Sequence, residues 1–220
     1  MKLLALETSG SACSVALAID GAVSERECIL PRRHGEVLLS WIDELLAAGG
    51  VGGTMLDAIA VSRGPGSFTS LRLGASVALG LALGWEVPLI PVSSLAALAA
   101  GAAEKHGVRR IAAAFDARRG QYYFVCFAAN GGRLQPCGAE QLAGAAEIVP
   151  AGPAWFGAGP GYAARDGELA AALAPHLAGV DADCRPRAAA VAALALDARP
   201  LDPDDFTLHY GRDNVVQPAL

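Results

Sequence analysis

A glycine-rich loop between a buried strand and a long helix limits the fold of this chain more than any other feature. Residues 58–62 (AIAVS) are apolar up to the final serine, which is typical of a strand covered on both faces. The loop at residues 63–70 (RGPGSFTS) follows directly, and a helix rich in small residues continues to about residue 83. Strands and helices then alternate along the chain, and this alternation favours a fold built of α/β layers.

The order of the predicted elements occurs twice. Each half begins with an apolar strand that ends in an acidic residue, Glu7 in the first half and Asp116 in the second. The first half is expected to contain strands at residues 2–7, 14–19, 22–29, 58–62 and 88–92 and helices at residues 35–48, 67–83 and 94–103. The second half is expected to contain strands at residues 110–116, 121–128, 133–137 and 154–156, with a helical stretch before the last strand and two alanine-rich helices after it.

This order predicts a two-lobed α/β fold with a mixed sheet in each lobe flanked by helices. The first lobe is expected at residues 1–103 and the second at residues 104–220. The segment from Arg199 onward is rich in proline and aspartate, so we expect it to be an extended tail that wraps back.

Composition agrees with a folded protein of modest negative charge. The 220 residues are 53% hydrophobic and 18% charged, which excludes intrinsic disorder for most of the chain. Seventeen basic and 22 acidic residues give a net charge of −5. The chain therefore lacks the basic footprint of autonomous nucleic-acid binding and the polybasic run of a protein that binds an anionic membrane.

The five cysteines form no CxxC pair and no Cys/His cluster with zinc-ligand spacing. We therefore expect no metal site, and reduced cysteines in a reducing compartment. The first apolar run ends at Glu7, which is too short for a signal peptide, and Glu86, Pro88 and Pro91 interrupt the most apolar region. These features predict a cytoplasmic protein without a membrane span.

The loop supplies the first candidate site. Glycines between a strand and a helix free backbone N–H groups to bind an anion, which would place a phosphate beside Gly64, Gly66, Ser67 and Thr69. The loop lacks the Gly-Lys-Ser/Thr ending of a P-loop and the third glycine of a dinucleotide fingerprint. The alternative is a tight turn in which Ser67 or Thr69 caps the helix.

Acidic residues at strand ends supply the second candidate site. Glu7 with Thr8, and Asp116 with Arg118, stand where carboxylates can hold magnesium and nucleotide phosphates. Together with the loop, they outline a candidate vestigial nucleotide or phosphate cleft. The alternative is that each carboxylate caps its turn or pairs with a neighbouring arginine.

The small-residue helix supplies a candidate partner interface. Its glycines and alanines leave grooves where a second helix can approach closely, and the preceding helix adds large apolar side chains. The expected interface residues are Trp41, Leu45, Leu71, Gly74, Ala78 and Gly80. The alternative is that this face packs against the sheet of its own lobe.

Taken in order, these motifs resemble the TsaB (YeaZ) family. The resemblance is carried by residues 3–17 (LLALETSGSACSVAL), 33–34, 56–74 (LDAIAVSRGPGSFTSLRLG), 92–97 (VSSLAA) and 115–122 (FDARRGQY), and more loosely by residues 210–215 (YGRDNV). The chain departs from the family pattern at three positions. Glu7 stands in place of Asp, Ser70 replaces a glycine, and Gly211 interrupts the tail signature.

The resemblance implies the two-lobed fold of the actin, hexokinase and Hsp70 superfamily, which is RNase H-like. It also implies a non-catalytic subunit that supports the transferase TsaD in making N6-threonylcarbamoyladenosine at position 37 of tRNA. The implied partners are a TsaD-like paralogue, a TsaE-like ATPase and, when the chain is alone, a second copy of it, with tRNA bound only through the complex. No catalytic residue, cofactor or metal is implied, since the paired-histidine motif of TsaD-like proteins is missing, and Mg-ATP would bind only weakly or through the complex.

Two other functions remain as alternatives. The first is a small ATP/Mg-dependent phosphotransferase or ATPase of the actin-like superfamily, with Glu7 and Asp116 around magnesium; this rests on analogy of fold. The second is direct tRNA binding, which would use Arg63, Arg72, Arg118 and Arg119. The acidic charge balance opposes the second alternative, because phosphate contacts need many basic residues.

Overall fold

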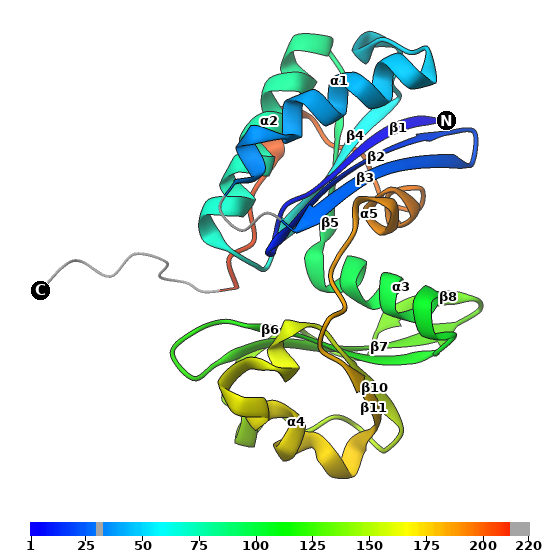
Figure 1. The fold of residues 1–220 in the computed structure, drawn as a ribbon. Coiled ribbons are helices and arrows are strands. Elements are labelled where there is room, and N and C mark those ends of the chain that lie inside the picture. The colour runs from blue at the N-terminus through cyan, green and yellow to red at the C-terminus, as the bar shows by residue number, and fades with distance from the viewer. Residues whose placement is uncertain (30–32, 212–220) are drawn as a thin grey trace, which may run out of the picture. The chain divides into compact units, whose positions relative to one another are not determined.

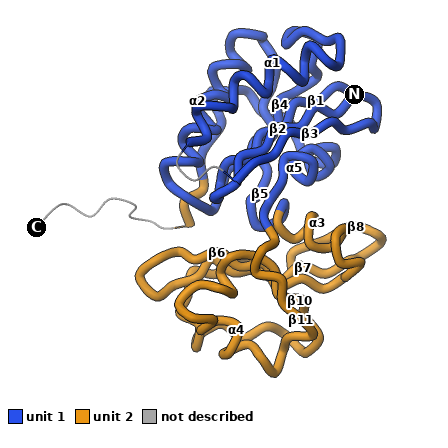
Figure 2. Tube along the Cα trace, in the orientation of Figure 1, with its two compact units in different colours: residues 1–97, 185–208 blue, residues 98–184, 209–220 orange. Residues whose placement is uncertain are grey.

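The computed structural model describes residues 1–29 and 33–211, and the chain divides into two compact units. Unit 1 comprises Met1–Ala97 and Arg185–Leu208, and unit 2 comprises Leu98–Cys184 and His209–Leu220 (Figure 2). Each unit contains one mixed sheet with helices beside it, so the expected fold class is confirmed. The loosely matched tail motif at residues 210–215 lies largely outside the described residues.

Unit 1 contains a five-stranded sheet in the order β3-β2-β1-β4-β5. Its strands are β1 (Lys2–Glu7), β2 (Ala12–Ile19), β3 (Ala22–Ile29), β4 (Ala58–Gly64) and β5 (Leu89–Ser93). β1 pairs antiparallel with β2 and parallel with β4. Asp20 and Gly21 form the turn between β2 and β3 with φ angles of 48° and 91°, as expected for a tight hairpin.

Different helices cover the two faces of this sheet (Figure 1). Leu4 and Leu6 join an apolar cluster with α1 (Leu38–Gly49) and α2 (Phe68–Trp85). Strand alternation places the cross-strand neighbours Ala16, Ala5 and Ala60 on the other face, where α5 (Ala188–Ala195) packs. Because both faces are covered, apolar residues follow one another along most of β1 and β4 and do not alternate with polar ones.

Residues 185–208 belong to unit 1 because specific hydrogen bonds hold them there. The Ala188 N–H donates to Ser14 Oγ (2.8 Å) and the Ala189 N–H donates to Glu25 Oε1 (2.9 Å). Leu89 and Leu201 exchange backbone hydrogen bonds of 3.0 and 2.8 Å. The units therefore differ from the expected lobes at residues 1–103 and 104–220, since the chain returns to unit 1 after Cys184.

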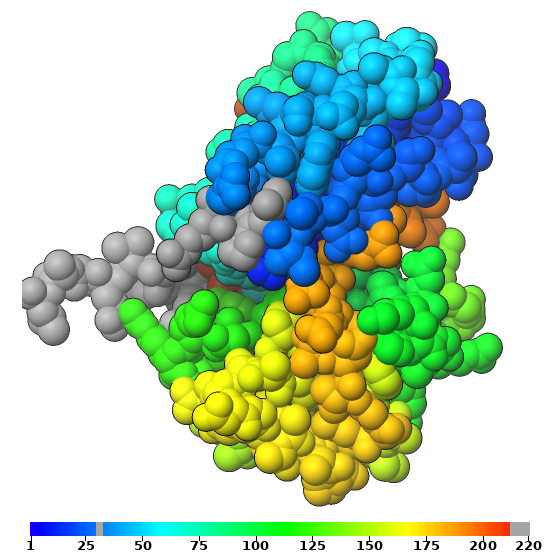
Figure 3. All heavy atoms as spheres, in the orientation of Figure 1, coloured from blue at the N-terminus to red at the C-terminus, as the bar shows by residue number. Residues whose placement is uncertain are grey.

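β3 forms an exposed edge of the unit 1 sheet. Its residues are exposed except Glu25, which is half-buried, and blue atoms from this part of the chain lie on the visible face in Figure 3. The charged run Glu25, Arg26 and Glu27 discourages pairing of this edge with another strand. The alternating sequence predicted an outer strand, and the structure confirms it.

Unit 2 contains a six-stranded sheet whose main path has the order β11-β10-β6-β7-β8, with β9 pairing to β7. Its strands are β6 (Arg110–Asp116), β7 (Tyr122–Asn130), β8 (Arg133–Pro136), β9 (Gln141–Ala143), β10 (Trp155–Ala158) and β11 (Leu177–Asp181). The end of α3 (Ser94–His106) and α4 (Glu168–Leu173) complete the unit. Tyr122, Phe124, Trp155 and Tyr162 are the large aromatic residues of its core.

Two strands of unit 2 were not expected. β9 and a short 3-10 helix at Ala145–Glu147 occupy the stretch predicted as helical. β11 forms because it pairs in parallel with β10, where Gly179 lies against the ring of Phe156. Both strands depend on partners distant in sequence, so local periodicity does not indicate them.

Candidate functional site

The glycine-rich loop after β4 packs against the turn that follows β1. A Cβ atom on Gly66 would lie 2.4 Å from the carbonyl oxygen of Ser9, so only glycine allows this approach. The Ser67 N–H donates to the same carbonyl oxygen over 2.8 Å. These contacts fasten the loop to the turn after β1. Anion binding by Gly64, Gly66, Ser67 and Thr69 stays a prediction.

The start of α2 differs in detail from the expected cap. Ser67 occupies the N-cap position with extended backbone angles, but its side chain makes no capping hydrogen bond. Thr69 is exposed within the first turn, and the Arg72 guanidinium lies 3.9 Å from the centre of the Phe68 ring. The backbone of the loop, rather than a hydroxyl cap, therefore holds the helix start.

Glu7 is buried at the end of β1. Its side chain is 1% exposed, and its Oε1 accepts the Ser9 N–H over 2.5 Å. Oε2 has no hydrogen-bond partner among the described residues. Burial raises the pKa of Glu7, and the hydrogen bond from the Ser9 N–H opposes that rise. A carboxyl group in this setting carries a substantial cost when it ionises.

Thr8 connects the end of β1 to the start of α2. Its hydroxyl donates to the carbonyl oxygen of Ser70 over 2.8 Å. Gly74, one turn further along α2, lies directly against the same side chain, because a Cβ there would fall 2.2 Å from Thr8 Oγ1. Thr8 is thus fully occupied by contacts within unit 1.

Asp116 and Arg118 form a local ion pair in unit 2. Asp116 Oδ1 accepts the Arg118 N–H over 2.9 Å, and Arg118 Nη1 lies 3.3 Å from Asp116 Oδ2. Arg118, Arg119 and Gly120 all have positive φ angles (64°, 55° and 78°), which produces the tight turn between β6 and β7. These contacts match the capping and ion-pair alternative. A site shared with Glu7, which lies in unit 1, stays a prediction.

Four of the six residues of the predicted partner interface pack within unit 1. Leu45, Leu71, Gly74 and Ala78 are buried within unit 1 and belong to its own packing against the sheet. Their contacts match the alternative of packing against the sheet of the same lobe, and contact with a partner at these positions stays a prediction. Trp41 is half-buried against the same apolar cluster, and Gly80 is exposed.

The exposed side of α2 is formed by a different set of residues. Ser76, Gly80, Leu83 and Gly84 are exposed, and a Cβ built on Gly80 or Gly84 would meet nothing within 4 Å. α2 is long and apolar enough to cross a membrane when judged by length and composition alone. Its opposite side packs on β4 and has five buried residues.

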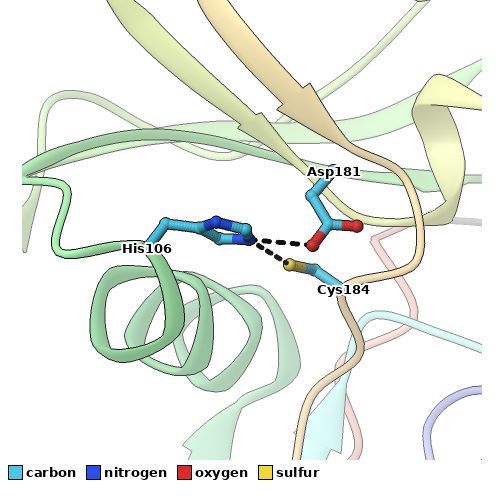
Figure 4. A group of neighbouring side chains, drawn as sticks. All are labelled: His106, Asp181 and Cys184. Atoms are coloured by element: carbon cyan, nitrogen blue, oxygen red, sulfur yellow. Dashed lines mark hydrogen bonds and ion pairs between the residues drawn. The ribbon is translucent and has the colours of Figure 1, made fainter.

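The structure also brings together three side chains that sequence spacing did not associate. His106 at the end of α3, Asp181 at the end of β11 and Cys184 in the following turn lie within 4.8 Å of one another, measured between their donor atoms (Figure 4). Hydrogen bonds, that from Lys105 above all, hold the pKa of the Asp181 carboxyl well below its usual range. His106 precedes the other two by 75 and 78 residues, so the only local signal was the D-x-x-C spacing.

Comparison with known proteins agrees with the motifs. The family described as TsaD, tRNA N6-adenosine threonylcarbamoyltransferase, matches residues 26–179. The Escherichia coli tRNA threonylcarbamoyladenosine biosynthesis protein TsaB is 45% identical over 125 residues, which are 57% of this chain and 54% of that protein. The chain thus spans about half the length of the curated relatives it matches.

Two solved structures from Pseudomonas aeruginosa match almost end to end. One, described as an uncharacterized protein similar to peptidase YEAZ, has a TM-score of 0.89 and is 33% identical, with 96% of this chain and 99% of that chain covered. The other, YeaZ, has a TM-score of 0.85 and is also 33% identical, with 95% and 99% covered. The sequence motifs, the family match and these two structures together show that the chain belongs to the TsaB (YeaZ) family of TsaD-type proteins.

Proposed function

We propose that this chain is a non-catalytic subunit of the machinery that makes N6-threonylcarbamoyladenosine at position 37 of tRNA, and that it binds and supports a TsaD-like transferase. Family membership supports the pathway, since the Escherichia coli relative is a tRNA threonylcarbamoyladenosine biosynthesis protein. The structural observation that carries the proposal is the exposed side of α2, which consists mainly of small residues beside an exposed leucine.

This surface permits close approach of another helix. Ser76, Gly80 and Gly84 recur every four residues on the exposed side of α2, so little side chain stands between this side of the helix and a second helix. On the same side, Leu83 is 60% exposed and offers apolar area. Helices pack at distances set by the side chains at the contact, and small residues let the two backbones come close. We call Ser76, Gly80, Leu83 and Gly84 the α2 surface.

In this proposal the α2 surface contacts the TsaD-like partner, and in the isolated chain it contacts a second copy. One surface then serves both associations, so the partner displaces the homodimer. A TsaE-like ATPase joins the complex, tRNA is held through the complex, and the assembly works in the cytoplasm. The negative net charge supports indirect tRNA contact.

The contacts around the candidate cleft residues support a non-catalytic role. Glu7 is buried with a raised pKa, and the Ser67 N–H that would hold a phosphate donates to Ser9. Asp116 is engaged by Arg118. A phosphotransferase or ATPase would need these groups to be released before magnesium or phosphate could bind. Calorimetric titration with Mg-ATP tests that alternative, and heat of binding below millimolar nucleotide would support it.

The decisive experiment measures association. Size-exclusion chromatography with light scattering is applied to the chain alone and to its mixture with the TsaD-like protein of the same organism. We expect a dimer that converts to a heterocomplex. Leu83→Glu, which places a charge on the α2 surface, should weaken both associations by more than about 10-fold, since a charge in an apolar contact is costly.

Leu196→Glu is the matched control. Leu196 is also in unit 1 and is 59% exposed, but it lies at the end of α5. It should leave association unchanged, and both variants should melt near the wild-type temperature. Equal association for Leu83→Glu and Leu196→Glu would contradict docking on the α2 surface. Failure of the wild-type chain to bind the TsaD-like protein would contradict the proposed function itself.

A further inference from the structure

The convergence of His106, Asp181 and Cys184 lies wholly within unit 2 and plays no part in the function proposed above. His106 Nε2 is 2.8 Å from Asp181 Oδ2 and 3.8 Å from Cys184 Sγ. Figure 4 shows the imidazole of His106 pointing from the end of α3 toward the turn that carries the other two residues. Imidazole nitrogen, carboxylate oxygen and thiolate sulfur are three ligand types that zinc accepts.

The same three residue types also occur in catalytic triads, and the geometry separates the two cases. In a Cys-His-Asp triad, the thiol and the carboxylate bind different nitrogens of the imidazole ring, so that the ring relays a proton. Here both groups face Nε2, as the two dashed lines in Figure 4 show. Three donor atoms within 4.8 Å of one another can instead be ligands of one metal ion.

The distances suit tetrahedral zinc. Ideal zinc bonds of about 2.0–2.1 Å to nitrogen or oxygen and about 2.3 Å to sulfur place such donors roughly 3.4–3.6 Å apart. The N–S separation of 3.8 Å is close to that value. The N–O separation of 2.8 Å is a hydrogen bond that would open by about half an ångström when a metal replaces the proton.

The surrounding contacts hold the three donors in place. Asp181 Oδ1 accepts the Asp183 N–H over 2.9 Å, which turns Oδ2 toward His106. The imidazole ring lies 4.5 Å from the Phe156 ring, measured between centroids, so its plane is fixed by packing. Such outer contacts orient ligands and raise the metal affinity of a site. The His106 side chain is 27% exposed, so an ion can reach the site from solvent.

We propose that His106, Asp181 and Cys184 bind a zinc ion, with a fourth position open to water, and that the ion joins the end of α3 to the turn after β11. Lys105 is the internal competitor for this ion. Its ammonium lies 2.8 Å from Asp181 Oδ2, the oxygen that would bind zinc, and its side chain is 59% exposed. It can therefore swing into solvent when the metal enters.

The test uses the full chain, stripped of metal and kept reduced with a phosphine. Cobalt is titrated as the optical probe, and zinc is then added to displace it. We expect one cobalt ion per chain with a thiolate-to-cobalt absorption band. Zinc at about 100 times its Kd should raise the melting temperature by roughly 5 °C or more. Absence of cobalt and zinc binding up to millimolar concentration would overturn the proposal.

Variants assign the ligands. Cys184→Ala should abolish the charge-transfer band and, like Asp181→Asn and His106→Gln, weaken zinc binding by more than about 10-fold. Lys105→Met should tighten zinc binding several-fold, an effect not expected if the three residues form only a hydrogen-bond network. Cys137→Ala is the matched control, because Cys137 is a free cysteine of the same unit that lies on the surface. A band lost in Cys137→Ala and kept in Cys184→Ala would overturn the assignment.

A second measurement on the wild-type chain covers the case in which a variant fails to fold. Zinc should slow alkylation of Cys184 several-fold, measured by mass spectrometry of the peptides, and should leave Cys137 unaffected. Equal alkylation rates for Cys184 with and without zinc would contradict the proposal. Neither readout depends on the TsaD-like partner, so this inference and the proposed function can fail independently.

Discussion

Gly74 of α2 lies so close to Thr8 that a Cβ atom on the glycine would be 2.2 Å from the threonine hydroxyl oxygen. Thr8 cannot turn away easily, because its hydroxyl donates to the carbonyl oxygen of Ser70 over 2.8 Å. This approach sets how closely α2 packs on the end of β1. It also explains why a glycine suits a helix interior, where it otherwise costs about 1 kcal/mol relative to alanine.

The first prediction compares two glycines of the same helix. Gly74→Ala should lower the free energy of unfolding by about 1–3 kcal/mol, because the added methyl overpacks the contact with Thr8. In the monomer, at concentrations too low for dimer formation, Gly80→Ala should raise it by roughly 0.5–1 kcal/mol, because that position is open in the single chain and alanine favours the helix. Urea denaturation of the two variants measures both changes. Equal effects at the two positions would contradict the packing described.

The second prediction concerns the glycine-rich loop. Gly66→Ala places a methyl group only 2.4 Å from the carbonyl oxygen of Ser9, which is far inside van der Waals contact. Neither backbone can move without breaking the Ser67–Ser9 hydrogen bond, so we expect destabilisation of about 2 kcal/mol or more. Gly10→Ala is the control, since a Cβ there meets nothing within 4 Å. Thermal melting of both variants checks the contrast.

The third prediction is a pH dependence that comes from Glu7. Burial raises its pKa above the ordinary value of 4.5, so the folded chain holds this proton more tightly than the unfolded chain. The stability from the protonated form is fully present below the unfolded-state pKa and is lost as pH rises through the folded-state pKa. Glu7→Gln should remove this loss, and its advantage over wild type should grow as pH increases from acidic to neutral.

Urea titrations at several pH values measure that difference. Glu104→Gln, which changes an exposed glutamate, is the control. Its difference from wild type in the free energy of unfolding should not grow as pH increases from acidic to neutral. A constant offset between Glu7→Gln and wild type across the pH range would contradict the raised pKa of Glu7.

The fourth prediction concerns cysteine reactivity. Burial raises the pKa of both Cys13 and Cys126 to about 12, so at neutral pH these thiols carry almost no thiolate. Cys28 and Cys137 are exposed. Alkylation of the folded chain should therefore label Cys28 and Cys137 first, and denaturant should be required for Cys13 and Cys126. Peptide mass spectrometry over a time course measures the order.

The fifth prediction tests how α5 is held. The buried Ala188 N–H donates to Ser14 Oγ, and Ser14→Ala leaves that donor without a partner. A buried unsatisfied N–H costs about 1–3 kcal/mol, so the variant should lose that much stability. Ser24→Ala, on the exposed strand β3, should stay within about 0.5 kcal/mol of wild type. Loss of stability in both would point to a general effect of serine removal.

Much of the fold and the family assignment follow from sequence because they depend on local signals. Asp20-Gly21 predicts its hairpin, since glycine accepts a positive φ, and the unbroken apolar runs of β1 and β4 predict strands buried on both faces. In the same way, the glycines of residues 63–70 predict the turn before α2. These preferences act over a few neighbouring residues, so the sequence alone is enough to read them.

Tertiary structure decided what depends on contacts between distant segments. Gly74 and Gly80 are the same residue type in the same helix. One is nevertheless buried against Thr8 and the other is exposed, because the sheet covers only one side of α2. β11 forms through its pairing with β10. The convergence of His106 with Asp181 and Cys184 arises in the same way. Such contacts depend on which distant segments pack together, and hydrophobic periodicity along the chain does not indicate those pairings.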